Sequence, residues 1–191
     1  EKEKGRMLAK VDEWAGEGLR LLGLAYLIDG SIDNHSGYTW AGLVGMEDPM
    51  REGVKEAVKV AQKAGIQVKM ITGDYLKTAE HIAQTIGILK EGDLSLEGSA
   101  ISAMSDEELQ ACVEETSVFA RIRPQDKLRI VKALQVNGEI TSMIGDGVND
   151  APALQRANIG VVVGAATDVA KETADLILLD SNFSTIVAAI E

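Results

Sequence analysis

The stretch Ile144-Gly145-Asp146-Gly147-Val148-Asn149-Asp150-Ala151-Pro152-Ala153-Leu154 sets two carboxylates and an amide on a glycine-rich turn, directly after an apolar segment at 140–144 that predicts a β-strand. Pro152 then predicts the start of a short helix. Oxygen ligands on such a turn suit Mg²⁺, which takes one or two protein carboxylates, keeps several waters and binds beside phosphate. Asp146 and Asp150 are therefore candidate metal ligands, and the strand–turn–helix order favours an α/β fold.

Around this stretch, predicted strands alternate with predicted helices along nearly the whole chain. Alternation of this kind implies a mainly parallel sheet with helices on both faces, because parallel strands need crossover connections that a helix supplies. The predicted strands lie at 19–28, 38–46, 67–71, around 118, and at 140–144, 159–163 and 176–179. The predicted helices lie around 7–14, after Pro49 up to Gly65, at 75–86, from a capping box at 105–108, at 125–136, and near 152 and 169.

Two further strand ends carry polar groups, and ligands of open α/β sheets bind beyond the carboxyl ends of the strands. Thr72-Gly73-Asp74 follows the strand at 67–71 and offers a hydroxyl, an unobstructed backbone N–H and a helix N-terminus, which are groups that hold a phosphoryl oxygen. Arg121 follows the strand around 118, and Lys127 falls in the first turn of the next helix. The helix dipole disfavours a cation there, so Lys127 implies an anionic partner.

Each cluster also has an ordinary structural explanation. Thr72-Gly73-Asp74 is a common helix-capping string, a lone Lys127 is typical of a solvated surface, and glycine with aspartate is usual in turns. The three clusters all follow strands and are expected to meet at one edge of the sheet. Together they predict a site for a phosphoryl group and Mg²⁺.

The composition excludes some classes of partner. The chain has 30 acidic and 19 basic side chains, a formal charge of -11 and no basic run, so nucleic acid is not an expected partner. The single cysteine, Cys112, cannot form an internal disulfide and is expected to pack in the core. No apolar run approaches the roughly 20 residues of a membrane-spanning helix.

The three clusters resemble signature motifs of P-type cation-transporting ATPases, within the haloacid dehalogenase superfamily. The matching strings are Met70-Ile71-Thr72-Gly73-Asp74, Arg121 with Pro124 and Lys127, and the eleven residues at 144–154. The resemblance implies a Rossmann-like haloacid dehalogenase fold. It also implies that residues 1–37 are the C-terminal tail of a nucleotide-binding domain and that 38–191 are a phosphorylation domain, which Asp48-Pro49 with Arg51 would open. The run before Pro49 looks more like pumps for calcium, sodium, potassium or protons than pumps for heavy metals.

The resemblance also implies a role for each matching residue, with ATP as substrate and Mg²⁺ as cofactor. Lys127 would neutralise charge that spreads over the transferred phosphoryl group in the transition state. The phosphoryl group would be held by Thr72, Gly73, Lys127 and Asn149; the nucleotide ribose would be reached by Asp74 and Arg121; Mg²⁺ would be ligated by Asp146, and Asp150 would complete the metal and lysine network.

The family's phosphorylated aspartate lies in an Asp-Lys-Thr-Gly sequence on the first, central strand, and this sequence does not occur here. We therefore expect that strand to be missing, with the nucleophile upstream of Glu1, and the isolated chain to be inactive. The remaining strands would then close over a gap, leave unpaired edges or recruit another chain. The expected partners are the rest of the same ATPase (upstream segment, nucleotide and actuator domains, membrane helices) and the transported cation, with this chain in a cytoplasmic domain of a multi-pass membrane protein.

Two other functions remain open at this stage. A stand-alone haloacid dehalogenase-type phosphatase would use Asp29 of Asp29-Gly30-Ser31 as its nucleophile, although Ser31 stands where a second acid is needed. Asp29, Asp48 and Asp180 are otherwise expected to be turn and capping residues. A nucleotide- or metal-binding module without turnover would need only the residues already named.

Overall fold

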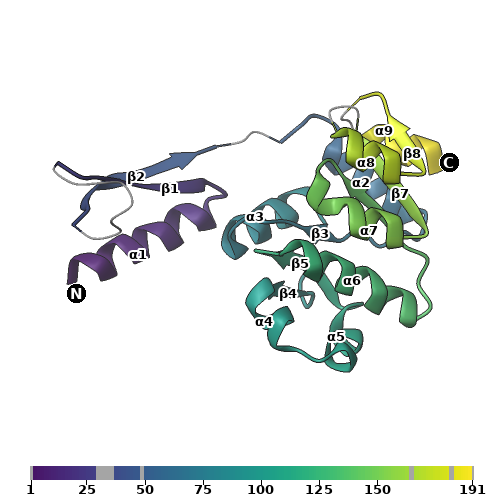
Figure 1. The fold of residues 1–191 in the computed structure, drawn as a ribbon, viewed down its shortest axis with the longest axis horizontal. Helices are drawn as coiled ribbons and strands as arrows, with labels where there is room; N and C mark the ends of the chain where they lie inside the picture. Colours follow the sequence, from purple (N-terminus) through teal and green to yellow (C-terminus); the bar gives the residue numbers. More distant parts are fainter. Residues whose placement is uncertain (1, 29–36, 48–49, 164–165, 181–182, 191) are drawn as a thin grey trace.

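A computed structural model describes residues 2–28, 37–47, 50–163, 166–180 and 183–190. Helix α1 (Lys2–Gly16) and the strands β1 (Arg20–Tyr26) and β2 (Thr39–Met46) form an N-terminal unit, which lies to one side of the rest of the chain (Figure 1). Strands β1 and β2 pair antiparallel, from Arg20 opposite Met46 to Tyr26 opposite Thr39. The remaining elements, from α2 onward, are called the larger body below.

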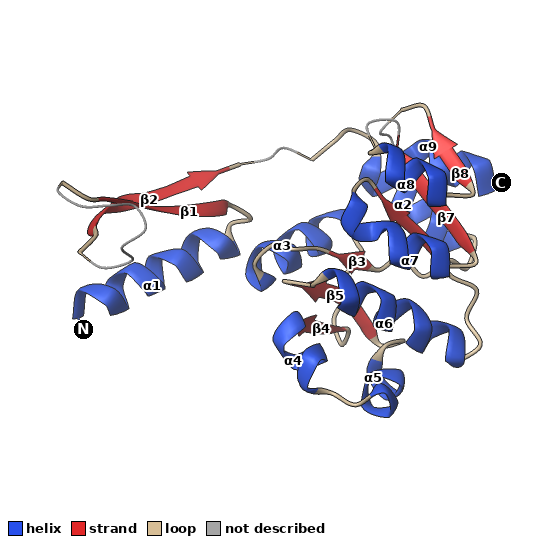
Figure 2. Ribbon diagram, viewed as in Figure 1, coloured by secondary structure: helices blue, strands red, loops and turns tan. Residues whose placement is uncertain are grey.

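The larger body contains two parallel three-stranded sheets flanked by helices (Figure 2). The first sheet has the order β3-β5-β4 and the second the order β6-β7-β8. The strands are β3 (Met70–Ile71), β4 (Leu94–Glu97), β5 (Thr116–Ala120), β6 (Ser142–Gly145), β7 (Ile159–Val163) and β8 (Leu176–Leu178). The helices are α2 (Val54–Lys63), α3 (Leu76–Ile86), α4 (Gly98–Ala103), α5 (Asp106–Cys112), α6 (Pro124–Val136), η1 (Val148–Asp150), α7 (Ala151–Arg156), α8 (Asp168–Thr173) and α9 (Phe183–Ile190).

Strand β5 is the centre of the first sheet, and helices cover both of its faces. Successive side chains of a strand point to opposite faces. Accordingly Val118 and Ala120 belong to a core with residues of α2 and α3, whereas Phe119 belongs to another core with residues of α4, α5 and α6. A third core joins α6 to the second sheet and to α7 and α8. The predicted parallel strands with helices on both faces are confirmed.

Strand β2 differs from its expected place in the parallel series. It pairs with β1, so the pairing crosses the boundary that the sequence predicts after residue 37. The physical reason is that parallel neighbours need a crossover connection, usually a helix, whereas antiparallel neighbours do not. The polar, turn-rich sequence between β1 and β2 predicts no helix, so a hairpin is the favoured pairing.

The lengths of several elements also differ from expectation. Strand β3 has only two residues in its ladder instead of the five at 67–71. Next to this short ladder, the Lys69 ammonium donates to the main-chain oxygens of Thr116 at 2.8 Å and Glu114 at 2.7 Å. The sequence pattern does not predict β4 or α4, and the predicted capping box of Ser105 and Glu108 is confirmed at the start of α5.

Strands β3 and β6 are each paired on one side only among the described residues, β3 with β5 and β6 with β7. Side chains nevertheless connect the two sheets, because Ile71 of β3 packs against both the core under α5 and the core of the second sheet. Within the described part of the chain, no helix is long and apolar enough to cross a bilayer.

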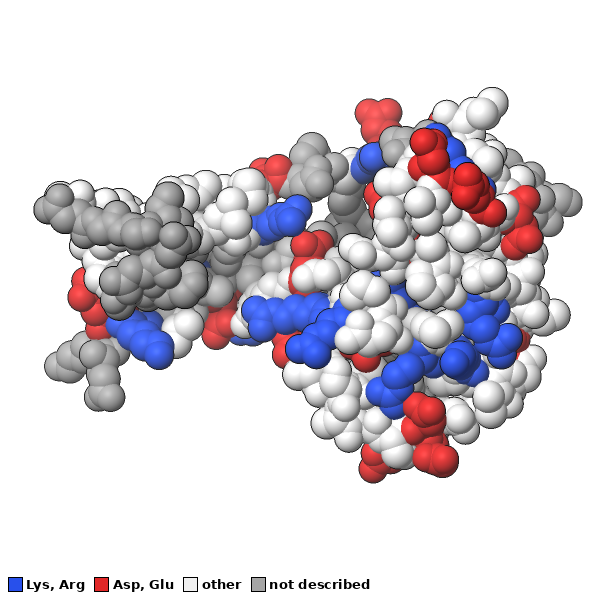
Figure 3. Space-filling view, viewed as in Figure 1, with Lys and Arg blue, Asp and Glu red and all other residues white. Residues whose placement is uncertain are grey.

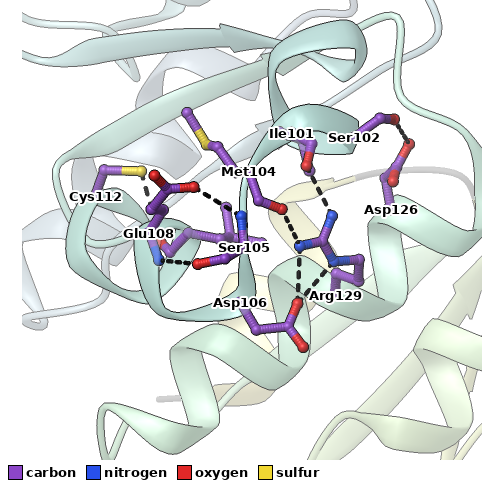
Figure 4. Close-up of polar contacts among 10 residues, drawn as sticks. Ile101, Ser102, Met104, Ser105, Asp106, Glu108, Cys112, Asp126 and Arg129 are labelled. Atoms are coloured by element: carbon purple, nitrogen blue, oxygen red, sulfur yellow. Dashed lines mark hydrogen bonds and ion pairs between the residues drawn. The ribbon is translucent and has the colours of Figure 1, made fainter.

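Arg129 anchors α6, the helix that joins the two sheets (Figure 4). Its guanidinium donates to the main-chain oxygens of Ile101 at 2.7 Å and Met104 at 2.8 Å, and to the carboxylate of Asp106. Ser102 also donates to the buried Asp126 at 3.5 Å. The end of α4 and the start of α5 are thereby fixed against α6, whose first turn carries Lys127.

Candidate functional site

A buried ion pair joins the ends of two strands that belong to different sheets. The ammonium of Lys127, in the first turn of α6 after β5, donates to Oδ1 of Asp150, which ends η1 after β6. Their side chains are 17% and 8% exposed. The contact places the carboxyl ends of β5 and β6 on the same side of the molecule, as the sequence predicts, and gives Lys127 an anionic partner.

Gly145 makes room for the Asp150 side chain. A Cβ added at Gly145 would lie 2.6 Å from Cβ of Asp150 and 2.8 Å from its Oδ2, which is closer than heavy atoms can approach. The same Oδ2 accepts from the backbone N–H groups of Asp146 and Gly147 at 3.4 Å each. Asp150 therefore has both oxygens engaged, one by the lysine and one by the turn.

Asp146 has the carboxylate best suited to a metal. Its side chain is exposed, as is that of Asn149 on the same turn, and no hydrogen bond or ion pair of the Asp146 carboxylate is found within the described part of the chain. No group of three or more acidic, histidine or cysteine side chains that could hold a metal occurs among the described residues. A site of this composition fits Mg²⁺, which relies on few carboxylates, water and phosphate oxygens, and does not fit an ion that needs an all-protein shell.

The turn after β3 is a compact hydrogen-bonded loop. The Thr72 hydroxyl donates to Oδ2 of Asp74 at 3.0 Å and accepts from the Asp74 backbone N–H at 3.1 Å. The Thr72 backbone N–H donates to the Phe119 oxygen at 2.8 Å, which extends the pairing of β3 with β5. A Cβ added at Gly73 would meet no atom within 4 Å, so the backbone there is open to a ligand.

Arg121 is held close to this turn by its backbone. Its N–H donates to the Asp74 oxygen at 3.0 Å, and the next N–H, of Ile122, donates to the Thr72 oxygen at 3.0 Å. Arg121 has φ 51, the one positive φ of a non-glycine residue in the described part of the chain. A left-handed backbone at a side chain of this size costs free energy and is found where surrounding structure enforces it, often at functional sites.

A cavity of about 330 Å³ lies between the N-terminal unit and the larger body. Gly73, Asp74 and Arg121 contribute to its wall, so these three residues share one surface. Arg20, at the start of β1, lines the same cavity, with Nε 3.9 Å from Oδ1 of Asp74. Arg20 is not among the predicted site residues, because no local sequence pattern shows that the first residue of β1 faces a loop of the larger body.

The contacts between α1–β1 and α3 are called the seam here. The Tyr75 hydroxyl donates to Oδ1 of Asp12 at 2.8 Å, and the Thr78 hydroxyl donates to the Leu19 oxygen at 3.0 Å. Above all, the hydrogen bond from Tyr75 lowers the pKa of the Asp12 carboxyl, and the same hydrogen bond raises the pKa of the Tyr75 phenol. Lys77 adds a cation 3.4 Å from the Asp12 carboxylate.

Positive charge gathers near the site although the chain as a whole is acidic. In Figure 3, Lys and Arg side chains form a band that runs from beside the N-terminal unit across the middle of the larger body. Arg121, Arg123 and Lys127 lie close together in sequence at the start of α6, and Arg129 and Lys132 lie along it. Arg121, Lys127 and Arg129 each have a carboxylate within 4 Å, so this positive charge is partly offset.

The predicted site residues therefore fall into two groups. Lys127 and Asp150 are in contact, with Asp146 and Asn149 on the same turn as Asp150. The second group is Thr72, Gly73, Asp74 and Arg121, joined by backbone hydrogen bonds. Asp29 and Asp48 lie outside the described residues. Asp180 accepts from the Thr185 hydroxyl at 2.8 Å, which is a side-chain contact near the start of α9.

Comparison with known proteins gives the family. Residues 6–158 match a family model described as haloacid dehalogenase-like hydrolase, and residues 127–190 match a second model with the same description. The chain is 42% identical to Calcium-transporting ATPase 1 of Lactococcus lactis over 98% of its own length and 22% of that protein's. It is 44% identical to Cation-transporting ATPase pma1 of Synechocystis, over 99% of the chain and 22% of the relative.

An Arabidopsis thaliana relative, Calcium-transporting ATPase 2, plasma membrane-type, is 46% identical over 93% of the chain and 18% of its own length. The chain thus spans about a fifth of the length of the curated relatives it matches. The parallel strands, the helices on both faces and the motifs at the strand ends agree with these matches. The chain belongs to the haloacid dehalogenase-like hydrolase family, in which its relatives are P-type cation-transporting ATPases.

Proposed function

We propose that this chain is a catalytic segment of an ATP-driven, cation-translocating P-type ATPase, and that it holds Mg²⁺ and the transferred phosphoryl group during formation and hydrolysis of an aspartyl phosphate. The observation that carries the proposal is the contact between Lys127 and Asp150, which sets a cation at the meeting point of strand ends that also present Asp146 and Asn149. The remainder of the same ATPase, its membrane helices and the transported cation are the partners in this proposal, with the segment on the cytoplasmic side.

Each residue has a definite task in this function. Mg²⁺, held by Asp146, would neutralise negative charge on the phosphoryl oxygens. Lys127 has two ammonium hydrogens beyond the one donated to Asp150, and these are available to phosphoryl oxygens. Asp150 orients the lysine through their hydrogen bond. Asn149 supplies an amide donor from the same turn.

The Thr72 hydroxyl must change its partner when a phosphoryl group binds. Its hydrogen now points to Oδ2 of Asp74, and that oxygen would lose this donor when the hydroxyl turns to a phosphoryl oxygen. Gly73, where an added Cβ would meet no atom within 4 Å, would leave room for the phosphoryl group to approach the backbone. Asp74 and Arg121 then face the nucleotide from the cavity wall that they share with Arg20.

Calorimetric titration with ATP, with and without Mg²⁺, tests the proposal. We expect Mg²⁺ to strengthen binding, Asp146→Asn to abolish that gain, and Lys127→Met to weaken binding about tenfold, since a charge-assisted hydrogen bond contributes roughly 1.5 kcal/mol. Glu107→Gln, an exposed acid at the start of α5, is the matched control for Asp146→Asn and should change nothing. No ATP binding, or an unchanged Mg²⁺ dependence in Asp146→Asn, contradicts the proposal.

Mass spectrometry after incubation with magnesium ATP or acetyl phosphate tests the expected inactivity. The sequence has no Asp-Lys-Thr-Gly, so we expect no covalent phosphate. Phosphate that appears and is lost in Asp29→Asn would instead support a self-sufficient phosphatase. A binding module would be supported by two results together. The chain would bind ATP and Mg²⁺ tightly, and it would remain inactive after an upstream Asp-Lys-Thr-Gly segment is restored.

A further inference from the structure

We propose that Tyr75 is a positioning residue for nucleotide binding: its ring holds the guanidinium of Arg121 at the seam cavity, and its hydroxyl holds α1 against the same cavity. The inference rests on the proposed function, since it takes the ligand of the cavity to be a nucleotide. Tyr75 is not among the predicted site residues, and its role would make the seam part of the ligand-binding structure.

The first observation is the stacking of Arg121 on Tyr75. The guanidinium carbon lies 4.7 Å from the centroid of the tyrosine ring, within the range of a cation–π contact. The Arg121 side chain is 56% exposed, and its Nη1 lies 3.9 Å from Oε1 of Glu97. An exposed arginine otherwise samples many rotamers, so the ring contact removes freedom that a bound ligand would have to remove.

The second observation is that both ends of this contact are fixed. The Arg121 N–H donates to the Asp74 oxygen, and the surrounding structure keeps Arg121 at its positive φ. Gly98 packs against it so closely that a Cβ added at Gly98 would lie 2.3 Å from the Arg121 oxygen. The Tyr75 backbone caps α3, and the hydroxyl at the far end of the side chain donates to Asp12. The ring therefore stands as a rigid support between α1 and Arg121.

The third observation is the chemistry of the cavity wall. Tyr75, Arg20 and Arg121 line it together with the apolar side chains of Val11 and Leu22 and the open backbone of Gly73. Its volume of about 330 Å³ is in the lower part of the range of small-molecule sites. Two arginines beside apolar walls suit a ligand with an anionic part and a flat part, which is the chemistry of a nucleotide.

The geometry predicts that ligand binding and the seam are coupled. The cavity is built from α1 and β1 on one side and from the turn after β3 on the other. A ligand that fills it contacts both sides, and Tyr75 contacts both sides already. Loss of the Tyr75 ring should free Arg121 and loosen the wall at once, whereas loss of the hydroxyl alone should only loosen the wall.

Two variants separate these effects, and both are compared with Arg121→Ala. Tyr75→Phe keeps the ring and removes the hydroxyl, whereas Tyr75→Leu removes both. In ¹⁵N–¹H spectra of the chain, the Arg121 Hε signal should be shifted upfield by the ring in the wild type and in Tyr75→Phe, and should lose that shift in Tyr75→Leu. The far-UV circular dichroism of all variants should match the wild type.

ATP titration supplies the second readout. Arg121→Ala should weaken ATP binding about tenfold, Tyr75→Leu about fivefold and Tyr75→Phe about twofold, from the usual strengths of charged and cation–π contacts. The double variant Tyr75→Leu/Arg121→Ala should be no weaker than Arg121→Ala within a factor of about two, because Tyr75 acts through Arg121.

The outcomes distinguish this inference from the proposed function. No ATP binding by the wild type overturns both. Binding that is weakened by Arg121→Ala but not by Tyr75→Leu, fully additive effects in the double variant, or an Arg121 Hε signal without an upfield shift in the wild type each overturn the inference about Tyr75 and leave the proposed function standing.

Discussion

Removal of either member of the Lys127–Asp150 pair is expected to destabilise the chain strongly. Breaking a buried ion pair by removing one partner costs about 3–5 kcal/mol, because a buried charge is left uncompensated. The Lys127 and Asp150 side chains are 17% and 8% exposed, and Oδ2 of Asp150 keeps its two backbone donors. The expected loss in free energy of unfolding for Lys127→Met is therefore smaller, about 2–3 kcal/mol. Asp150→Asn keeps the shape of the side chain and should cost about 2 kcal/mol.

Urea unfolding followed by far-UV circular dichroism measures these free energies of unfolding. The double variant Lys127→Met/Asp150→Asn should lose less than the sum of the single losses, with a coupling of about 1–2 kcal/mol. Lys132→Met, an exposed lysine of the same helix, is the control and should stay within about 0.5 kcal/mol of the wild type. Strictly additive losses would refute the reasoning, because they would mean that Lys127 and Asp150 do not interact in solution.

Three further predictions concern stability. Arg129→Met should cost about 2–3 kcal/mol in the same urea assay, since it leaves two main-chain oxygens and a carboxylate without their donor; a loss below about 0.5 kcal/mol would contradict the network of Figure 4. Gly145→Ala should cost about 1–3 kcal/mol, whereas Gly5→Ala in the exposed face of α1 should be neutral or stabilising, and equal effects would disprove the close approach at Gly145. The Tyr75 hydrogen bond lowers the pKa of Asp12, so the ionised carboxylate stabilises the fold above the ordinary pKa of 3.8, and this stabilisation is lost as pH falls through the lower folded pKa. The difference in stability between the wild type and Asp12→Asn, followed by tryptophan fluorescence, should therefore shrink from about pH 5 downward. A difference that grows there would exclude the contact.

The sequence predicts the parallel α/β architecture and most of its elements because their signals are local. The helix from Pro124 to Val136 and the capping box at Ser105 depend on residues close together in the chain, and both are confirmed. The Lys127–Asp150 contact agrees with what the resemblance to P-type ATPases implies; the residues alone predict only that the ends of these strands share one edge.

The features that the sequence does not reveal depend on contacts between distant segments. Three such contacts are the pairing of β2 with β1, the approach of Arg20 to Asp74 and the hydrogen bond from Tyr75 to Asp12. In each case the local sequence around one residue does not identify its distant partner. Strand β4 has the alternating sequence Leu94-Ser95-Leu96-Glu97, but four residues between turns are too few to stand out.

The division of the larger body into two sheets has a consequence for how the chain folds. In the second sheet Ser142 pairs with Ile159 and Val161 with Leu176, across connections about one helix long. In the first sheet Met70 pairs with Val118, across α3, β4, α4 and α5. Short loops close more quickly than long ones, so we expect the second sheet to form before β3 pairs with β5. Hydrogen exchange should therefore show that the two sheets open as separate units, which are coupled through the side chains of α6 and Ile71.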